Sequence, residues 1–233
     1  MPKIYTRKGD DGTTGLLYGG DRVSKDAPVI EANGAVDEAQ AVIGVARAAA
    51  AAGGELDSVL VEIERDLWVL MAEVATAPPH RHKLRAGKSL VTTDMVTGLE
   101  ARIDELNTRF DMPVDFVVPG QNTVAALLDV ARTVVRRSER LVVTAMADVD
   151  SQVGPYLNRL SDLLWTMARW QEGEHLLARA GGAGHTSASK DVPPGRGTAT
   201  KKGTATKKGT AIKKDTAIKK GTVTTKSKKS KES

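Results

Sequence analysis

The chain has 233 residues, 40% of them hydrophobic, which is enough to bury one substantial core but not the cores of two large domains. It contains no cysteine, so disulfides, thiolate metal sites and cysteine nucleophiles are excluded. The first residues are polar, and no apolar run is long enough to span a bilayer. We therefore expect a soluble, cytoplasmic protein with one globular domain.

The formal net charge of +5 is distributed unevenly along the chain. Residues 190–233 hold 14 lysines and arginines against 3 acidic residues, which leaves 20 basic and 26 acidic residues in positions 1–189. The positive charge thus belongs to the C-terminal end, and the part that is expected to fold is acidic. A nucleic-acid-binding protein would fit the C-terminal end but not the rest of the chain.

The C-terminal end is a low-complexity repeat. Blocks of six residues such as GTATKK follow one another from Gly197 to Lys226, a period that matches neither a helix nor a solenoid. Glycine, threonine and lysine offer too little apolar surface to offset chain entropy, so we expect residues 184–233 to form a disordered tail and residues 1–183 the folded domain. The tail is either a solvated extension or an electrostatic tether for nucleic acid or another acidic surface.

Within residues 1–183, apolar residues recur at helical spacing and strand signals are few. The expected helices cover, in chain order, Val29–Ala52, Glu55–Ala77, Thr92–Phe110, Asn122–Asp148 and a stretch from near Pro155 to Gly181. Glycine pairs and prolines mark their ends. Long helices with short connections predict an all-α fold, a five-helix antiparallel bundle.

The helix expected over residues 122–148 has one charged and one apolar face. At 100° per residue, a sector of about 140° holds a stripe of four arginines. They are Arg132, Arg136, Arg137 and Arg140, and Glu139 lies in the same sector. Guanidinium groups are planar, permanently charged forks that suit phosphate oxygens, and their crowding costs stability unless an anion lies opposite. The alternative is a solvated face with arginine–glutamate pairs.

The last expected helix carries a second polar stripe. Asn158, Asp162 and Arg169 fall within about 40° of one another on the helical wheel, beside Trp165. Because the apolar residues of this helix lie in other directions, Asn158 and Asp162 face either a ligand or another helix or subunit.

The N-terminal segment combines hydroxyl groups, cations and glycines. It consists of Thr6, Arg7, Lys8, Gly9, Asp10, Asp11, Gly12, Thr13, Thr14 and Gly15. Glycines let backbone N–H groups approach phosphate oxygens, while threonine and lysine add donors and charge. The segment is neither a Walker A loop nor a Rossmann fingerprint, and its composition also fits a flexible polar terminus.

Six separated blocks of the sequence form one further pattern. They are TRKGDDGTTGL at 6–16, RVSKD at 22–26, EANGAVDE at 31–38, FVVPG at 116–120, ARTVVRRSER at 131–140 and YLNRLSD at 156–162. Together, and in this order, they resemble the signature blocks of the PduO-type ATP:cob(I)alamin adenosyltransferases. This resemblance covers about residues 3–180. It implies a ferritin-like bundle that assembles as a homotrimer, with active sites between neighbouring subunits. It also implies transfer of the 5′-deoxyadenosyl group of ATP to the cobalt of cob(I)alamin, with Mg²⁺ as cofactor and triphosphate as second product.

The resemblance also implies roles for individual residues. ATP would bind under the loop Thr6–Gly15, and its triphosphate would be surrounded by basic side chains, namely Lys25, Arg136, Arg137 and Arg140. Glu139 and Asn158 would help to hold the nucleotide or magnesium, with Glu139 as the metal ligand.

The same resemblance implies catalytic roles for Asp37, Phe116, Arg132 and Arg136. Asp37 would pair with Arg132 across a subunit boundary, and Phe116 would cover the lower face of the corrin. Asp162 would hold the last helix against the site. Gln121 and Asn122 stand where relatives often carry small residues, so the start of the fourth helix is expected to differ.

Parts of the same sequence also fit other functions. A catalytically silent ATP- or corrinoid-binding sensor or chaperone could use the same bundle. A ferritin-like metal protein would need a Glu-x-x-His motif on two helices, and residues 172–175 supply one such motif. An adenosyltransferase would work with a reductase that delivers cob(I)alamin and with a mutase or dehydratase that uses adenosylcobalamin.

Overall fold

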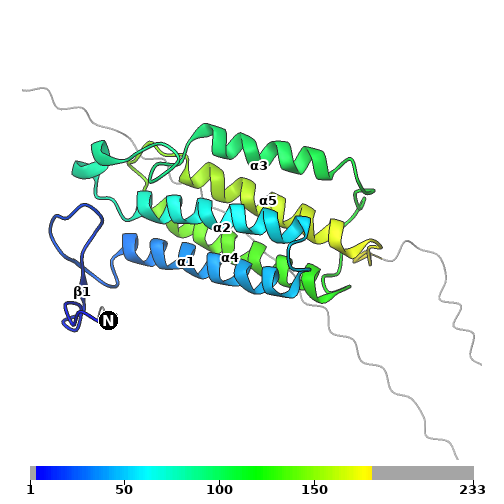
Figure 1. The fold of residues 1–233 in the computed structure, drawn as a ribbon, viewed down its shortest axis with the longest axis horizontal. Coiled ribbons are helices and arrows are strands. Elements are labelled where there is room, and N and C mark those ends of the chain that lie inside the picture. Colours follow the sequence, from blue (N-terminus) through cyan, green and yellow to red (C-terminus); the bar gives the residue numbers. More distant parts are fainter. Residues whose placement is uncertain (1–3, 180–233) are drawn as a thin grey trace, which may run out of the picture. The chain divides into compact units, whose positions relative to one another are not determined.

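The structure is a computed structural model that describes residues 4–179. Within that part the secondary structure is almost entirely helical (Figure 1), as the sequence predicts. The long helices are α1 (Pro28–Ala49), α2 (Glu55–Val74), α3 (Thr93–Leu106), α4 (Thr123–Ala145) and α5 (Val153–Glu172). None of the described helices is long and apolar enough to cross a membrane. The predicted tail over residues 184–233 lies outside the described residues.

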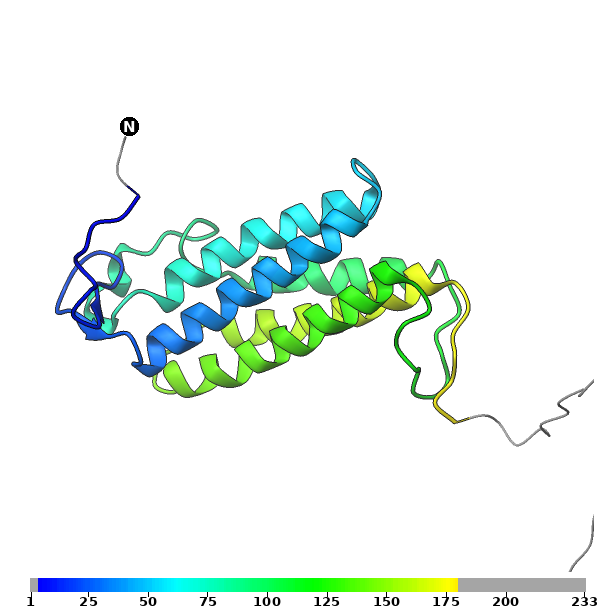
Figure 2. The same ribbon diagram turned by 90° about the horizontal axis from the view of Figure 1, so that it is seen from below.

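The helices form a bundle in which α1 packs against α2 and α4, α4 against α5, and α3 against α5. These pairs are antiparallel except α3 and α5, which run in the same direction (Figures 1 and 2). Fully buried aliphatic side chains such as Ile43, Leu60, Leu128 and Leu160 fill the interior. Each contributes about 2 kcal/mol by leaving water, so this interior is the main source of stability. The predicted all-α bundle is thus confirmed.

The boundaries of α1 to α4 differ from the expected ones by a few residues, but α5 ends at Glu172, well before the expected Gly181, because Gly173 follows it with a φ of 74°. Local hydrogen bonds accompany the earlier ends of α2 and α3. After α2 ends at Val74, the Thr76 hydroxyl donates to the carbonyl of Ala72 at 2.7 Å. After α3 ends at Leu106, the Arg109 N–H donates to the Leu106 carbonyl at 2.9 Å, which is a turn rather than further α-helix.

Two smaller elements lie at the end of the bundle where α1 begins (Figure 2). The strands β1 (Thr13–Thr14) and β2 (Val23–Ser24) pair as a two-stranded antiparallel sheet within the N-terminal segment. The 3₁₀ helix η1 (Pro78–Lys83) follows α2. The N–H of Leu17 donates to the carbonyl of Ala75 at 2.8 Å, so the N-terminal segment is tied to the end of α2.

The opposite end of the bundle, where α4 begins and α5 ends, carries the loop between α3 and α4 (Figure 2). The chain after α5 runs alongside this loop. The Val118 N–H donates to the carbonyl of Leu176, and the Ala178 N–H donates to the carbonyl of Phe116, both at 2.7 Å. The loop that carries Phe116 is therefore held by the segment after α5.

Candidate functional site

One face of α4 carries the arginine stripe that the sequence predicts. The other face is buried through apolar residues at helical spacing, namely Ala125, Leu128, Ala131, Val135 and Val142. Since the core takes those positions, Arg136 and Arg140 are exposed, and Arg132 and Arg137 are half-buried. From Arg132 to Arg140 the helix rises about 12 Å, so the stripe is long enough to follow an extended polyphosphate.

The arginines of the stripe differ in their contacts. Arg137 forms an ion pair with Glu38 of α1, and Arg140 donates to the carbonyl of Arg136 at 2.9 Å. Among residues 4–179, no carboxylate lies within ion-pair distance of Arg136 or Arg140. Neighbouring cations without acidic partners repel each other, and an anion bound between them would relieve that repulsion.

Arg132 has its partner on its own helix in this chain. Its Nε lies 3.1 Å from Oδ1 of Asp129, one turn earlier on α4. Asp37 is exposed on α1 and is accessible to another subunit. The expected pair between Asp37 and Arg132 would join two subunits, so it stays a prediction.

A carboxylate and an amide meet between α4 and α5. The side-chain amide of Asn158 donates to Oε1 of Glu139 at 3.0 Å, beside the arginine stripe. Asp162 lies elsewhere on α5, where its Oδ2 accepts from Arg159 at 2.9 Å, and Arg159 in turn binds Glu100 of α3. The structure thus brings Asn158 and Glu139 together, whereas Asp162 lies on the side of α5 that faces α3.

A pocket of about 550 Å³ opens at the end of the bundle where α4 begins. Its rim comes from the loop before α4, and its floor from α4 and α5. The lining residues are Pro113, Val114, Asp115, Phe116, Val117, Pro119, Asp129, Arg132, Trp165 and Arg169. Phe116 is 80% exposed and Val114 of the same loop is 96% exposed, and neighbouring exposed apolar side chains are typical of a surface that a ligand or partner covers. The pocket therefore joins an apolar rim to a charged floor, and it contains both Phe116 and Arg132.

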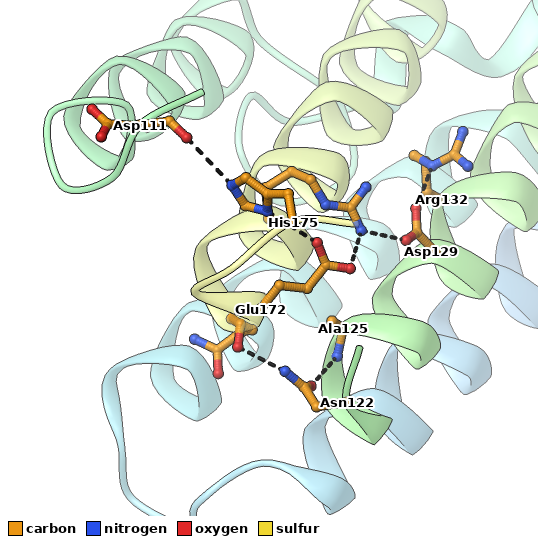
Figure 3. A network of polar contacts seen from close by, with 9 residues as sticks. Asp111, Asn122, Ala125, Asp129, Arg132, Glu172 and His175 are labelled. Atoms are coloured by element: carbon orange, nitrogen blue, oxygen red, sulfur yellow. Dashed lines mark hydrogen bonds and ion pairs between the residues drawn. The ribbon is translucent and has the colours of Figure 1, made fainter. Parts of the chain in front are cut away.

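Asp129, Arg132 and Arg169 line this pocket and belong to a network of charged side chains that continues away from it (Figure 3). Nη2 of Arg169 donates to Asp129 at 2.6 Å and to Glu172 at 2.8 Å. The other carboxylate oxygen of Glu172 lies 3.2 Å from Nδ1 of His175, whose Nε2 lies 3.3 Å from the carbonyl of Asp111. The spacing of Glu172 and His175 is visible in the sequence, but only as half of a metal-binding motif. Their contact with α4 is visible only in the fold.

The N-terminal segment folds into a cross-linked loop rather than a free terminus. Nε of Arg22 donates to the Thr13 hydroxyl at 2.7 Å, and Nη2 donates to the carbonyls of Thr13 at 2.8 Å and Lys8 at 2.6 Å. Nothing in the sequence pattern distinguishes Arg22 from other surface arginines, so its role emerges only from the fold.

Asp11 and Lys25 complete this loop. Oδ1 of Asp11 accepts the hydroxyl of Thr13 at 2.8 Å and its backbone N–H at 3.0 Å, and these hydrogen bonds lower the pKa of the Asp11 carboxyl. The backbone N–H of Lys25 donates to the carbonyl of Gly12 at 2.9 Å. A Cβ on Gly9 would lie 3.1 Å from Nζ of Lys25, so glycine at this position lets the lysine side chain cross the loop.

Within one chain, the expected site residues fall into three groups. The loop Thr6–Gly15 lies at the end of the bundle where α1 begins, and Phe116 at the opposite end (Figures 1 and 2). The arginines of α4 lie between them. A single chain therefore does not bring the N-terminal loop and the Phe116 pocket together.

Comparisons with known proteins agree with one another. The family model described as cobalamin adenosyltransferase matches residues 4–171. A corrinoid adenosyltransferase from Citrobacter freundii is 38% identical over 174 residues, which cover 74% of this chain and 96% of the relative. One from Mycobacterium tuberculosis (strain H37Rv) is 39% identical over 179 residues, covering 72% of this chain and 88% of the relative.

Solved structures give the same result. A variant of the PduO-type ATP:corrinoid adenosyltransferase from Lactobacillus reuteri, complexed with cobalamin and ATP, aligns with a TM-score of 0.69 at 29% identity. The alignment covers 76% of this chain and 100% of the other. Another variant, complexed with ATP, aligns with a TM-score of 0.67 at 28% identity over the same shares. The relatives found by sequence and by structure carry the same activity in their names.

Proposed function

Since the chain belongs to the cobalamin adenosyltransferase family, we propose that it transfers the 5′-deoxyadenosyl group of ATP to the cobalt of cob(I)alamin. The products are adenosylcobalamin and triphosphate. The observation that carries this proposal is the pocket in which the apolar loop around Phe116 meets Arg132, the first arginine of the α4 stripe. A corrin ring and a polyphosphate that react with each other need an apolar surface and a row of cations side by side.

The reaction needs no general base, because cob(I)alamin is itself a strong nucleophile. The cobalt(I) electron pair forms the Co–C bond to the ribose 5′ carbon while the C–O bond to the triphosphate breaks, and the leaving oxygen keeps that bonding pair. Fixed cations stabilise the charge that develops on the leaving group. We assign this role to Lys25, Arg136, Arg137 and Arg140, with Arg132 and Arg136 nearest the reacting carbon.

The loop Thr6–Gly15 is assigned to ATP. The contacts of Arg22 with Lys8 and Thr13 hold this loop in one shape, so less conformational entropy is lost when the nucleotide binds. Lys25 is held against the same loop, which supports a role for it beside the phosphates.

The residues around Glu139 fit a magnesium ion that is bound mainly by phosphate oxygens. Mg²⁺ commonly uses one or two carboxylates together with substrate phosphates, and Glu139 offers one carboxylate beside the amide of Asn158. In residues 4–179, no group of three or more acidic or histidine side chains gathers that could hold a metal by protein ligands alone. When bound, the ion would neutralise part of the triphosphate charge.

Phe116 is assigned to the lower face of the corrin. Reduction of cobalt(II) to cobalt(I) is hindered while a lower axial ligand stays bound, and an exposed phenyl ring next to the corrin would displace that ligand. The high exposure of Phe116 and its place on the pocket rim support this role.

We infer a homotrimer with active sites between subunits. The N-terminal loop and the Phe116 pocket lie at opposite ends of one bundle, so a complete site requires the loop of one subunit beside α4 of its neighbour. In such an assembly Asp37 would reach Arg132 of the next subunit, and Asp162, which binds Arg159 of its own helix, would hold α5 against the site.

The setting proposed for this enzyme is the cytoplasm. A reductase would supply cob(I)alamin, and a mutase or dehydratase would use the adenosylcobalamin. The lysine-rich tail over residues 184–233 is proposed to stand apart from catalysis, as a solvated extension or as a tether to an acidic surface.

Anaerobic incubation of the full chain with ATP, Mg²⁺ and chemically reduced cob(I)alamin tests the proposed function. The absorption spectrum of adenosylcobalamin should appear only when protein, ATP and cob(I)alamin are all present. Binding of ATP and corrinoid without this product would indicate a silent binding protein on the same fold and would contradict the proposal.

A further inference from the structure

We propose that the charge network centred on the buried Arg169 fixes Arg132 and the Phe116 loop relative to each other, so that Asp129, Arg169 and His175 are positioning residues of the transfer reaction. This inference rests on the proposed function. It adds to that function a physical connection between the side chain that faces ATP and the loop that faces the corrin.

The centre of the network is almost completely removed from water. Arg169 is 1% exposed and Asp129 is 5% exposed, and the side chain of Glu172 has no exposure at all. Charges alternate from Arg132 through Asp129 and Arg169 to Glu172, so each buried charge has an opposite neighbour. Buried ion pairs contribute little net stability compared with apolar residues of the same volume, because desolvation of the charges is costly. Stability therefore gives no reason for such a network at this place.

One end of the network sets the orientation of Arg132. Its contact with Asp129 uses Nε, and among the described residues neither terminal nitrogen of Arg132 has a partner. A guanidinium group that is held through Nε is restricted in its orientation, and its terminal nitrogens stay available for the ligand and for Asp37 of the next subunit. Because Asp129 is itself held by Arg169, rotation of Arg132 would disturb the whole network.

The other end of the network reaches the loop that carries Phe116. His175 contacts the carbonyl of Asp111 at the start of this loop, and its ring packs edge-on against Phe110 at 6.1 Å between centroids. The next residues after His175 continue the contact, since Leu176 accepts from Val118 and Ala178 donates to Phe116. The loop is thus fixed on the same segment that Glu172 and His175 attach to the network (Figure 3).

Arg169 depends on both carboxylates for its place. Its Nη2 binds Asp129 and Glu172, whereas its buried Nε has no partner among the described residues. Its guanidinium also lies 5.6 Å from the centroid of the Trp165 ring, which lines the same pocket. Loss of either carboxylate would therefore let Arg169 shift toward the pocket and move the groups at both ends.

Two variants separate the two ends of the network. Asp129→Asn keeps the size of the side chain but removes the charge that orients Arg132. His175→Leu keeps an apolar side chain against Phe110 but removes both polar contacts at the loop end. Glu174→Gln, on the same segment but outside the network, and Glu62→Gln, at an exposed ion pair of α2, serve as controls.

The measurements are kcat and KM for ATP, with pre-reduced cob(I)alamin and separately with cob(II)alamin plus a reductant, together with the thermal midpoint of each variant. Asp129→Asn should lower kcat about ten-fold or more with both corrinoids and change KM for ATP much less, since a misplaced catalytic group costs rate. Asp129→Glu should recover part of the loss. His175→Leu should lower kcat mainly with cob(II)alamin, while both controls should match the wild type.

If Asp129→Asn proves too unstable to fold, His175→Leu decides the question, because it leaves the ion pairs of Arg169 intact. Wild-type kcat in folded Asp129→Asn, or in His175→Leu with cob(II)alamin, would overturn the positioning role. A wild-type chain that forms no adenosylcobalamin would contradict the proposed function instead, so the two failures are distinguishable.

Discussion

At the scale of single residues, the exposure of Phe116 bears most directly on the proposed function. It lies on the rim of the pocket with Arg132 on the floor, and 80% of its surface is open to solvent. An aromatic ring of this kind gains free energy when a flat apolar ligand covers it. The position suits a residue that touches the corrin rather than one that supports the fold.

Replacement of Phe116 by alanine should therefore affect the reaction more than the stability. Adenosylation of cob(II)alamin supplied with a reductant should fall at least about ten-fold, or about 1.4 kcal/mol in transition-state free energy, because the lower ligand is no longer displaced. The same variant assayed with pre-reduced cob(I)alamin should lose much less activity and serves as its own control. Equal losses with both corrinoids would argue against this role of Phe116.

Asp66 is a half-buried carboxyl whose ionisation destabilises the bundle. Burial raises the pKa of Asp66 above 3.8, although the hydrogen bond from the Tyr156 hydroxyl at 2.9 Å opposes the shift, and Glu62 adds repulsion. The folded chain therefore holds this proton more tightly than the unfolded chain does. The resulting stability is fully present below pH 3.8 and is lost as the pH rises through the folded-state pKa.

Asp66→Asn should consequently gain stability relative to the wild type as the pH rises through this window, because asparagine does not ionise. Urea unfolding at a series of pH values measures the difference in free energy. Asp57→Asn is a control with the opposite expected result. The hydrogen bond from the Gly53 N–H lowers the pKa of Asp57, so Asp57→Asn should lose stability relative to the wild type as the pH rises. A pH-independent difference for Asp66→Asn would contradict the assignment.

The residues that could be predicted from the sequence are those whose chemistry repeats along one helix face. The stripe from Arg132 to Arg140 is visible from spacing alone, since the apolar face of α4 determines where the arginines point. The partners of Asp129 and Asp66 could not be predicted in this way. Asp129 meets Arg169 across 40 positions, and Asp66 meets Tyr156 across 90, so only the packing of the helices brings them together.

At the scale of elements, Asn122 joins α4 to α5 near the pocket. Its Oδ1 accepts the Ala125 N–H at 2.9 Å, which caps α4, and its Nδ2 donates to the carbonyl of Gln171 at 2.7 Å at the end of α5 (Figure 3). The asparagine thus caps one helix and holds the end of another, whereas the expected difference from relatives at this helix start stays a prediction.

Replacement of Asn122 by alanine should cost about 1–2 kcal/mol of unfolding free energy, because the cap and the contact with α5 are both lost. Asn122→Ser is the matched variant, since serine can cap α4 but cannot reach Gln171, and it should lose less. Thr92→Ala removes the cap of α3, where the threonine makes no second contact of this kind. Like Asn122→Ser, it loses one contact only and should cost less stability than Asn122→Ala. Equal free energies of unfolding of Asn122→Ala and the wild type in urea would contradict the role of Asn122 in joining α4 to α5.

The number and type of the helices could be predicted, but not every boundary or connection. Helical periodicity over long segments predicts α1 to α5, whereas their last turns depend on single hydrogen bonds such as that of Thr76. The shape of the N-terminal loop could not be predicted, because it depends on contacts of Arg22 with the Thr13 hydroxyl and with two backbone carbonyls that only the fold brings together.

At the scale of the whole molecule, the N-terminal loop and the Phe116 pocket lie apart within one chain, and this separation is the reason to expect that several subunits assemble. In a cyclic trimer, each site would take Lys25 from one subunit and Arg136 from the next, so the contact is heterologous and closes into a ring. Two variants that are each inactive can therefore restore activity in a mixed trimer, provided that each supplies the residue that the other lacks.

Mixing Lys25→Ala and Arg136→Ala chains tests this arrangement. Each variant alone should show strongly reduced activity, because one group that contacts the triphosphate is missing from every site. In mixed trimers from equal amounts, random cyclic assembly should give about one quarter of the sites both wild-type residues and should restore activity in proportion. Trimers should also be visible by light scattering. A mixture no more active than its components would place the whole site within one chain.

The central claim is tested most directly by measuring both products of one anaerobic reaction. The full chain is incubated with ATP, Mg²⁺ and cob(I)alamin, and adenosylcobalamin and inorganic triphosphate are quantified over time. Nucleophilic attack on the ribose 5′ carbon predicts that they appear in equal amounts, with the triphosphate released intact. Release of phosphate or diphosphate without a new cobalt–carbon bond would contradict it.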